Sequence, residues 1–291
     1  MLATAHVAPV PCALCRSASE RYCAVQDGAY RRCRTCGALF LHPMPTPDEM
    51  RAYAERHYRE GVYAEYARAR SLKIATFRQR LALIRKHAPG GRLLDIGAAC
   101  GFMLEAALEA GYEPAGVEFS EEAIRLAAPE VRGGITRGDM NDLPPGQYDV
   151  ITAFDILEHA QDPLATLRAW ADRLRPGGVL ALTTPDTDSF LRKAMRGRWP
   201  MLQPMQHTVL FSGTSMPRFL EEAGLQVLEL REATKVMTPA YLVGQLEPYF
   251  PRAARLGRRL AAAVPALADR AIPFRIGELI AIARKAARPA T

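Results

Sequence analysis

The chain has 291 residues, of which 49% are hydrophobic and 24% charged, and its formal net charge is +7. These proportions are those of a soluble globular protein with room for one large domain, or for one domain and a small module. No apolar run reaches about 18 residues, so no transmembrane helix is expected. Residues 1–12 lack the pattern of a secretory signal.

The positive charge is concentrated late in the chain. Residues 251–291 hold nine Lys and Arg against Asp269 and Glu278, which accounts for the whole net charge. A nucleic-acid enzyme would carry its basic charge around the active cleft. We therefore do not expect a nucleic-acid partner.

Four cysteines form two C-x-x-C pairs, Cys12 with Cys15 and Cys33 with Cys36, with 17 residues between the pairs. This spacing predicts a zinc ribbon over residues 1–41. Four thiolates leave zinc no open position, so the ion is expected to be structural and to supply most of the folding energy of so small a module. Cysteines that bind a metal rather than form disulfides fit a reducing cytosol, so we expect a cytoplasmic protein.

A proline-rich linker at 41–48 leads into two predicted helices, at about 47–60 and 62–87. Several tyrosines recur along these helices. In the simplest interpretation, their rings pack the helices against the next domain. These residues are Tyr53, Tyr58, Tyr63 and Tyr66.

The chain is organised around residues 92–120, which have the pattern of a strand, a glycine turn, a helix and a second strand. A short apolar run ends at Ile96, and Gly97 and Gly101 bracket the turn. Glu118 lies near the end of the second strand. Such a unit is the nucleotide-binding half of a doubly wound sheet, in which the acid can bind both hydroxyls of a ribose.

The turn differs from the dinucleotide-binding pattern, because Ala98 and Ala99 stand where a pyrophosphate would need a glycine. Asp95, on the strand before the turn, would repel phosphate but suits a cationic ligand. The stretch from Asp95 to Phe102, DIGAACGF, resembles motif I of class I S-adenosylmethionine (SAM)-dependent methyltransferases. Ala99 replaces the family's usual middle glycine.

The resemblance implies an α/β fold over residues 91–291, with a doubly wound, seven-stranded, mostly parallel sheet in the strand order 3-2-1-4-5-7-6. It also implies that residues 42–90 form a linker and a helical lid that covers the cofactor and helps to form the substrate pocket. The stretch from Cys12 to His57 is similar to the N-terminal part of many bacterial methyltransferases.

Two further strands are predicted, at 134–139 and 148–154. In the family, an acid after strand three accepts from the adenine amino group and the next side chain covers the ring. Asp139 and Met140 match these places, although Asp139 could instead cap a turn or helix. The resemblance gives the SAM-binding set as Asp95, Gly97, Ala99, Gly101, Phe102, Glu118, Phe119, Asp139, Met140 and Phe154.

The most specific resemblance follows strand four. The segments DILEH and PLATLRAWADRLRPGGVLALTTPD are similar to the family branch that includes ubiquinone-type O-methyltransferases and many natural-product and sugar enzymes. A helix is expected from Asp162-Pro163, and a strand at 179–184. Adenine- and cytosine-amino methyltransferases carry an (N/D)PP(Y/F)-type motif where this chain has Asp155 to His159, which counts against base methylation.

Two histidines are candidate general bases. His159 follows strand four at the carboxyl end of the sheet, where such sheets bind ligands. Its alternative role is that of a helix-start histidine bonded to backbone. His207 lies in an irregular segment, 190–216, that resembles the family's insertion over the acceptor. Glu158 could orient His159 or help to hold a metal.

A helix at 215–224 and strands at 225–233 and 278–285 complete the expected sheet. Between these strands, residues 236–275 form a predicted helical insertion with most of the late arginines. Its apolar residues have amphipathic spacing, so it either covers the sheet edge with a solvated basic face or binds an acidic acyl carrier protein or an anionic membrane surface. The apolar residues of this insertion are Leu256, Leu260, Val264 and Leu267.

The sequence therefore predicts a SAM-dependent methyltransferase with a structural zinc ion. Its acceptor is expected to be a small molecule or a carrier-linked group, methylated on oxygen in natural-product, sugar or polysaccharide biosynthesis. The expected location is the cytoplasm, where the protein is either free or attached peripherally to a membrane. The alternatives are a zinc-ribbon rRNA base methyltransferase, a non-catalytic SAM-fold binding protein, and another SAM-dependent reaction such as cyclisation.

Overall fold

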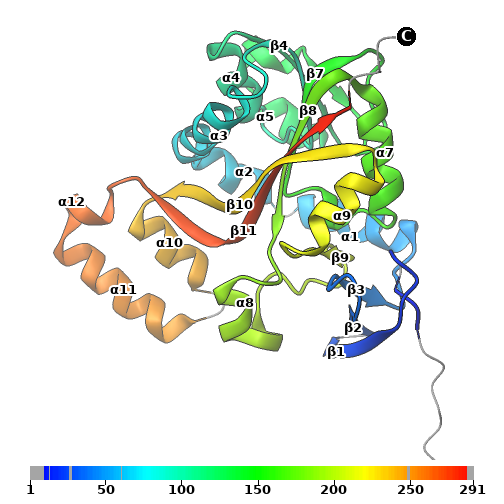
Figure 1. Cartoon of the computed structure of the whole chain (residues 1–291). Helices are drawn as coiled ribbons and strands as arrows, with labels where there is room; N and C mark the ends of the chain where they lie inside the picture. Colours follow the sequence, from blue (N-terminus) through cyan, green and yellow to red (C-terminus); the bar gives the residue numbers. More distant parts are fainter. Residues whose placement is uncertain (1–9, 13, 26–27, 60, 248–249, 287–291) are drawn as a thin grey trace, which may run out of the picture.

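The computed structural model describes residues 10–12, 14–25, 28–59, 61–247 and 250–286. Within them the chain forms a seven-stranded sheet and a four-stranded sheet (Figure 1).

The seven-stranded sheet has the strand order β6-β5-β4-β7-β8-β11-β10. The strands from β6 to β8 are parallel, and β11 is antiparallel to both of its neighbours. The predicted order 3-2-1-4-5-7-6 and the doubly wound fold class are thus confirmed. The strands are β4 (Gly91–Ile96), β5 (Tyr112–Glu118), β6 (Ile135–Arg137), β7 (Tyr148–Phe154), β8 (Leu174–Pro185), β10 (Leu225–Met237) and β11 (Ile272–Lys285).

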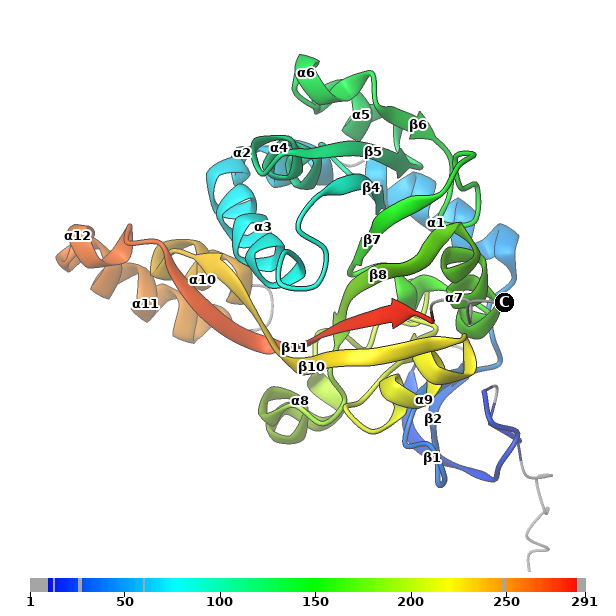
Figure 2. The same ribbon diagram turned by 45° about the horizontal axis from the view of Figure 1, so that its top comes forward.

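Helices cover both faces of this sheet. Figure 2 shows α3 (Arg70–Ile84) and α4 (Phe102–Glu109) on one face, and α7 (Pro163–Arg173) and α9 (Ser215–Glu222) on the other. The apolar spacing of α7 explains its orientation, because Leu167 and Trp170 on one stripe are fully buried. Two short helices follow β5: α5 (Glu121–Leu126) and α6 (Pro129–Arg132).

The lid segment forms three helices rather than two. The first is α1 (Pro47–Arg59), as expected. The predicted helix at 62–87 is divided at Ala69 into α2 (Val62–Arg68) and α3. The side chain of Tyr58 lies outside the described residues.

The N-terminal module does not stand alone. Its strands β1 (Ser19–Val25), β2 (Gly28–Cys33) and β3 (Leu39–His42) are joined by β9 (Val209–Leu210), which belongs to the segment after β8. Cys12, Cys33 and Cys36 also share one buried cluster with Phe211 and Phe219 of the main domain. The module and the main domain therefore share a sheet and a core.

Strands β10 and β11 continue past the sheet as a two-stranded ribbon, with Thr234 paired to Arg275 and Met237 to Ile272. The ribbon carries an arm of three helices, α10 (Pro239–Leu246), α11 (Pro251–Ala263) and α12 (Pro265–Ala268), at the left of Figure 1. The helical part of the insertion is therefore shorter than the predicted 236–275. Ile272, Phe274 and Ile276 alternate with more exposed residues, which is a strand pattern.

The remaining elements are short. They are α8 (Phe190–Met195) and the single-turn helices η1 (Leu157–His159) and η2 (Arg196–Arg198). Among the described residues, no helix combines the length and the apolar character needed to cross a bilayer.

Candidate active site

A cavity of about 870 Å³ lies at the carboxyl ends of β4, β5 and β7. Its walls come from the lid helices α1–α3, from the turn after β4, and from β10 and α10. Parallel α/β sheets bind ligands at this edge. Because α1, α2 and α3 all contribute lining residues, the lid helices form part of the cavity wall as well as packing on the domain.

The turn after β4 has a backbone that favours glycine. Gly97 and Gly101 both have φ 74°, and Ala99 has φ 47°. A Cβ atom on Gly97 would lie 2.2 Å from Cδ1 of Ile156, so no other residue fits without movement. Ala99 holds a left-handed conformation that disfavours side chains.

The carboxylate of Glu118 is buried at the end of β5 and organises this turn. Its Oε2 accepts from the backbone N–H of Ala99 at 2.8 Å, and its Oε1 accepts from the N–H of Ser120 at 2.8 Å. The hydroxyl of Tyr63 in the lid donates to Oε1 at 3.2 Å. Burial raises the pKa of Glu118, against the effect of these donors. This carboxylate thus links the lid, the turn and the sheet.

Asp95 ends β4 and lines the same cavity. Its Oδ1 accepts from the hydroxyl of Thr152 at 2.6 Å. Burial raises its pKa to about 7, and repulsion from Glu118 adds to that effect. A cation in the cavity would favour the ionised form of both carboxyl groups.

The cavity continues past β6 to Asp139 and Met140. The Asp139 carboxylate is exposed and accepts from the N–H of Asn141 at 2.6 Å. The carbonyl of Met140 accepts from the indole N–H of Trp170 at 2.9 Å, which fixes this loop against α7. Phe119 and Phe154 also line the cavity.

Two members of the predicted SAM-binding set lie behind the wall. Gly101 begins α4, and Phe102 is buried and stacked on Tyr66 with ring centroids 5.5 Å apart. Neither is among the described residues that line the cavity. They support the turn and the lid rather than the cavity surface.

His159 and His207 lie side by side, with ring centroids 5.0 Å apart. His159 lines the cavity, whereas His207 is buried behind it. Nδ1 of His159 is 2.9 Å from the carbonyl of Gln206, and Nδ1 of His207 is 2.7 Å from that of Met201. Because a carbonyl only accepts, each Nδ1 carries a proton and each Nε2 keeps its lone pair.

Burial lowers the pKa of both imidazoles. The pKa of His207 falls to about 4, because desolvation and then the neighbouring His159 disfavour its charged form. The pKa of His159 is lowered in the same direction, chiefly by desolvation. Both rings are therefore neutral at pH 7, the form that accepts a proton or binds a metal.

Glu158 completes a possible metal-binding group with these histidines. One donor atom from each of Glu158, His159 and His207 lies within 4.8 Å of the other two. The Glu158 side chain is buried, and its Oε2 has no hydrogen-bond partner among the described residues. Burial and then repulsion from Asp155 raise the pKa of Glu158. Carboxylate and imidazole donors suit a divalent transition ion.

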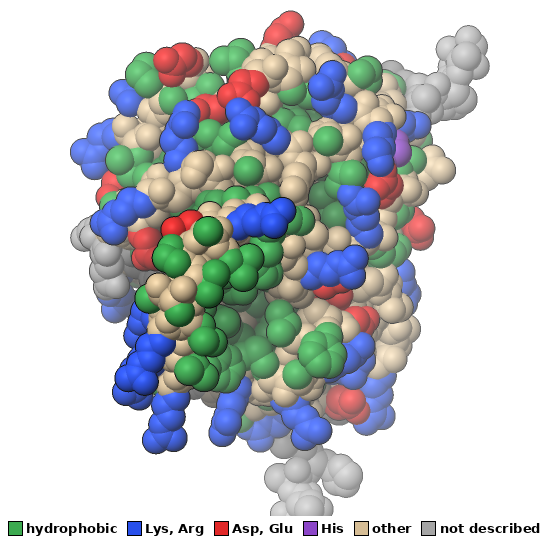
Figure 3. All heavy atoms as spheres, turned by 90° about the vertical axis from the view of Figure 1, so that its left-hand side faces the viewer, with side chains coloured by type: hydrophobic (Ala, Val, Ile, Leu, Met, Phe, Trp, Pro, Cys, Tyr) green, Lys and Arg blue, Asp and Glu red, His purple; other side chains and the backbone are tan. Residues whose placement is uncertain are grey.

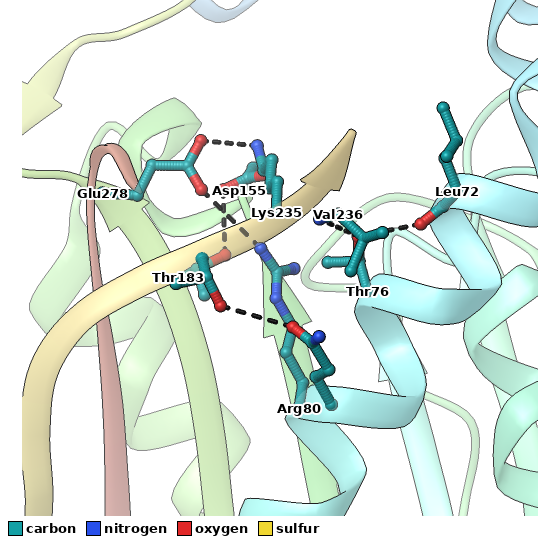
Figure 4. Close-up of polar contacts among 10 residues, drawn as sticks. Leu72, Thr76, Arg80, Asp155, Thr183, Lys235, Val236 and Glu278 are labelled. Atoms are coloured by element: carbon teal, nitrogen blue, oxygen red, sulfur yellow. Dashed lines mark hydrogen bonds and ion pairs between the residues drawn. The ribbon is translucent and has the colours of Figure 1, made fainter. Parts of the chain in front are cut away.

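Sequence reasoning missed a partly buried ionic network at the other end of the cavity, shown in Figure 4. Lys235 of β10 pairs with Glu278 of β11 and donates to Asp155 at 2.9 Å. Arg80 of α3 lies 3.6 Å from Glu278, and Thr183 donates to Asp155 at 2.8 Å. Although burial opposes it, Lys235 and then Arg80 hold the pKa of Asp155 well below its usual range.

The sequence gives little signal for this network, because its members pair across strands and helices far apart in the chain. The one local clue is the spacing of Thr76 and Arg80, which places both on one face of α3. Thr76 accepts from the N–H of Val236 at 2.8 Å, so this face packs on β10.

Arg80 is buried, yet its Nε and Nη2 have no hydrogen-bond partner among the described residues. Lys73, about two turns earlier in α3, also lines the cavity, with its Nζ 4.5 Å from the centre of the Tyr66 ring. Burial lowers the pKa of Lys73 to about 8. The side chains of Arg80 and Lys73 can both bind an anionic group in the cavity.

The four cysteines form a compact group away from this cavity. One sulfur distance, Cys12 to Cys36, is 3.8 Å, another, Cys15 to Cys33, is 3.3 Å, and all four sulfurs lie within 4.8 Å of one another. Zinc–sulfur bonds of about 2.3 Å in a tetrahedron separate sulfurs by about 3.8 Å. The cluster therefore fits the predicted structural zinc ion.

The strand order and the acid at the end of β5 define a class I methyltransferase fold. A family model described as a methyltransferase domain matches residues 65–230, more than half of the chain. The chain therefore belongs to the methyltransferase-domain family. This confirms the resemblance found in the sequence.

Curated relatives include ubiquinone biosynthesis O-methyltransferases. The one from Xanthomonas campestris is 35% identical over 104 residues, which cover 33% of this chain and 44% of the relative. The one from Nitrosospira multiformis is 27% identical over 183 residues, which cover 57% of this chain and 77% of the relative. The chain thus spans less than half the length of the Xanthomonas relative.

Solved structures share the fold. A putative methyltransferase from Bacillus halodurans has a TM-score of 0.51 at 17% identity, covering 72% of this chain and 100% of that one. The YcgJ protein of Bacillus subtilis has a TM-score of 0.51 at 20% identity, covering 72% of this chain and 98% of that one. At such identities the likeness concerns the fold alone.

Proposed function

We propose that the protein is a SAM-dependent methyltransferase that transfers a methyl group to an oxygen of its acceptor. The observation that carries this proposal is that Asp95, Glu118 and Asp139 converge on one cavity beside a glycine turn. Three carboxylates suit a cationic nucleoside and disfavour a phosphorylated one. The named activity of the ubiquinone-type relatives supports the choice of oxygen.

In this proposal, Asp95 and Gly97 face the methionine part of the cofactor, and Glu118 accepts hydrogen bonds from the ribose hydroxyls. Asp139 accepts from the adenine amino group, and Met140 covers the ring. Ala99 and Phe119 line the space between, beside Phe154.

Arg80 and Lys73 suit the carboxylate at the other end of the cofactor. The Nε and Nη2 donors of Arg80 are buried and make no hydrogen bond within the described residues, and the ion pair of Nη2 with Glu278 is a long one, at 3.6 Å. A bound carboxylate would satisfy these donors, whose burial without a partner is unfavourable.

When bound, SAM supplies a methyl group that its sulfonium already activates. The chain must align the acceptor hydroxyl with that group and remove its proton. His159 is the better base, because its ring lines the cavity and Nε2 keeps a free lone pair. His207, at 5.0 Å between ring centroids, supports it from behind, and with Glu158 the pair can alternatively hold a divalent ion.

The proposed acceptor is a small molecule or a carrier-linked group in natural-product, sugar or polysaccharide biosynthesis. The volume of about 870 Å³ is large enough for a cofactor and a small acceptor together. The four-thiol cluster supports a cytoplasmic location, because reduced thiols persist there.

Methyl-labelled SAM tests this function in a metabolite extract. The wild-type chain is expected to label at least one small molecule through an oxygen. His159→Ala should lower the rate by about 10²- to 10⁴-fold, the usual contribution of a general base. His87→Ala is the matched control, because His87 pairs with Glu229 away from the cavity. Unchanged turnover in His159→Ala and His207→Ala would remove both as bases.

A further inference from the structure

The arm formed by α10, α11 and α12 exposes a row of large apolar side chains that the proposed function does not use. Figure 3 shows this side of the molecule, where hydrophobic side chains gather on the surface with Lys and Arg around them. The exposed fractions in the row are 59% for Leu256, 63% for Leu260, 53% for Val264 and 57% for Leu267. Contiguous exposed apolar surface of this kind marks an interaction site.

The row has one orientation along the helix. Leu256 and Leu260 are four residues apart on one side of α11, and Val264 and Leu267 follow at the break between α11 and α12 and in α12. A different side of α11 packs on the arm, because Ala254 is buried and a Cβ on Gly257 would lie 2.8 Å from Val243. The exposed row is therefore a second, unpartnered apolar face.

Arginines lie beside that row. Helix α11 contains Arg252, Arg255, Arg258 and Arg259 and no acidic residue. Arg258 pairs with Glu247, whereas the ion pairs among the described residues include none of the other three. At 3.6 residues per turn, Arg252, Arg255 and Arg259 occupy the face next to Leu256 and Leu260.

We propose that α11 and α12 dock the protein on the surface of an anionic phospholipid membrane. An aliphatic row beside an arginine face is the arrangement of a helix that lies in the plane of a membrane interface. The leucines would enter the acyl boundary, and the arginines would contact lipid phosphates. An acidic protein would pair with the arginines but would have to supply a matching apolar groove along two helices.

The position of the arm gives this docking a consequence for the cavity. Tyr241 of α10 lines the cavity together with Val236 and Met237, at the start of the arm. A docked arm would bring this wall of the cavity near the lipid surface, where a lipid-carried acceptor can reach it. That consequence rests on the proposed function, whereas docking itself does not.

Co-sedimentation of the full chain with vesicles tests the proposal. The wild type is expected to bind vesicles that contain phosphatidylglycerol and to bind pure phosphatidylcholine weakly, with affinity that falls as salt rises. Failure to bind the anionic vesicles would overturn the proposal. SAM binding, measured separately, reports on the proposed function and is expected to be the same with and without vesicles.

Two sets of variants locate the surface. Leu256→Ser with Leu260→Ser should weaken vesicle binding at least about tenfold, and Arg252→Gln, Arg255→Gln and Arg259→Gln together on the order of a hundredfold. All five positions are exposed, so folding should be retained.

The control pairs Leu126→Ser with Arg125→Gln on α5, where both side chains are also exposed. It should bind vesicles like the wild type. Equal loss in the control, or no loss in the α11 variants, would contradict the proposal. Tight binding to an acidic acyl carrier protein, with none to vesicles, would assign the surface to a protein instead.

Discussion

The hydroxyl of Tyr30 donates a 2.6 Å hydrogen bond to the backbone carbonyl of His207. Tyr30 lies on β2 of the cysteine-containing module, and His207 is a candidate base beside the cavity. Pairing of Phe40 with Val209, two residues after His207, extends the same connection. The module therefore holds the segment that carries His207, which gives its predicted zinc ion a structural role in the site.

Tyr30→Phe tests this connection. The ring keeps its packing while one buried hydrogen bond is lost, so stability should fall by about 1 kcal/mol or more, with the carbonyl left unpaired. Methyl transfer should fall because His207 is less well held, and SAM affinity should not change. Tyr112→Phe is the matched control, since its hydroxyl donates to the carbonyl of Ala88 at 2.5 Å on a different part of the domain. Equal loss of turnover in both variants would indicate a general stability effect.

Removal of the metal should affect the same segment. We expect elemental analysis to find one tightly bound zinc per chain, lost in Cys33→Ser with Cys36→Ser. The zinc should be retained in the control Cys23→Ser, because Cys23 lies outside the four-cysteine group. Trp199 packs with Tyr30 and Leu210 in one cluster. Its fluorescence should therefore shift to longer wavelength when a strong chelator removes zinc. A chain without zinc, with unchanged fluorescence and stability, would contradict the structural role.

Gly97→Ala should strongly destabilise the protein. A left-handed alanine costs about 1–2 kcal/mol, and contact with Ile156 adds a further ~1–3 kcal/mol. Gly111→Ala separates the two effects, because Gly111 has φ 86° but no atom within 4 Å of an added Cβ. Equilibrium urea unfolding should show the larger loss for Gly97→Ala. Equal losses would mean that the contact with Ile156 is relieved by movement.

Asp95 predicts how stability depends on pH in the absence of cofactor. Its pKa is about 7 in the folded protein against an ordinary value of 3.8, so the folded state keeps a proton that the unfolded state loses. The free energy of unfolding should therefore fall by up to about 4 kcal/mol as pH rises from 3.8 to about 7.

Asp95→Asn should therefore remove that loss, so that the stability of the variant rises relative to the wild type between about pH 4 and about pH 7. Urea unfolding across this range measures the difference. The control is Asp172→Asn, whose side chain is exposed on α7. Asp172→Asn should keep the pH dependence of the wild type's free energy of unfolding. If Asp95→Asn keeps it too, the pKa of Asp95 is not raised in the folded protein. SAM binding should weaken in Asp95→Asn alone, because a carboxylate near the cation is lost.

The sequence predicts local features well. The turn from Asp95 to Gly101 and the two C-x-x-C pairs follow from patterns within a few residues, and the family resemblance then supplies the strand order. What it does not predict depends on contacts between distant segments. Lys235 and Glu278 pair across neighbouring strands, and neither position differs locally from a surface charge.

The pairing of β3 with β9 illustrates the same limit. Two short apolar segments, around Phe40 and Val209, carry no signal that they belong to one sheet. The break at Ala69 is likewise set by packing, because alanine favours a continuous helix. These features need the tertiary structure, and they are the ones that position the lid and His207.

The binding of SAM to Glu118 variants tests the central claim most directly. Isothermal titration of the wild type should give micromolar affinity or better, and Glu118→Ala should weaken it at least about tenfold, since the ribose loses its acceptor and Ala99 N–H its partner. Glu113→Ala, exposed on the same strand, should bind like the wild type. If Glu118→Ala and the wild type bind SAM equally well, or if neither binds it, this cavity is not the cofactor site.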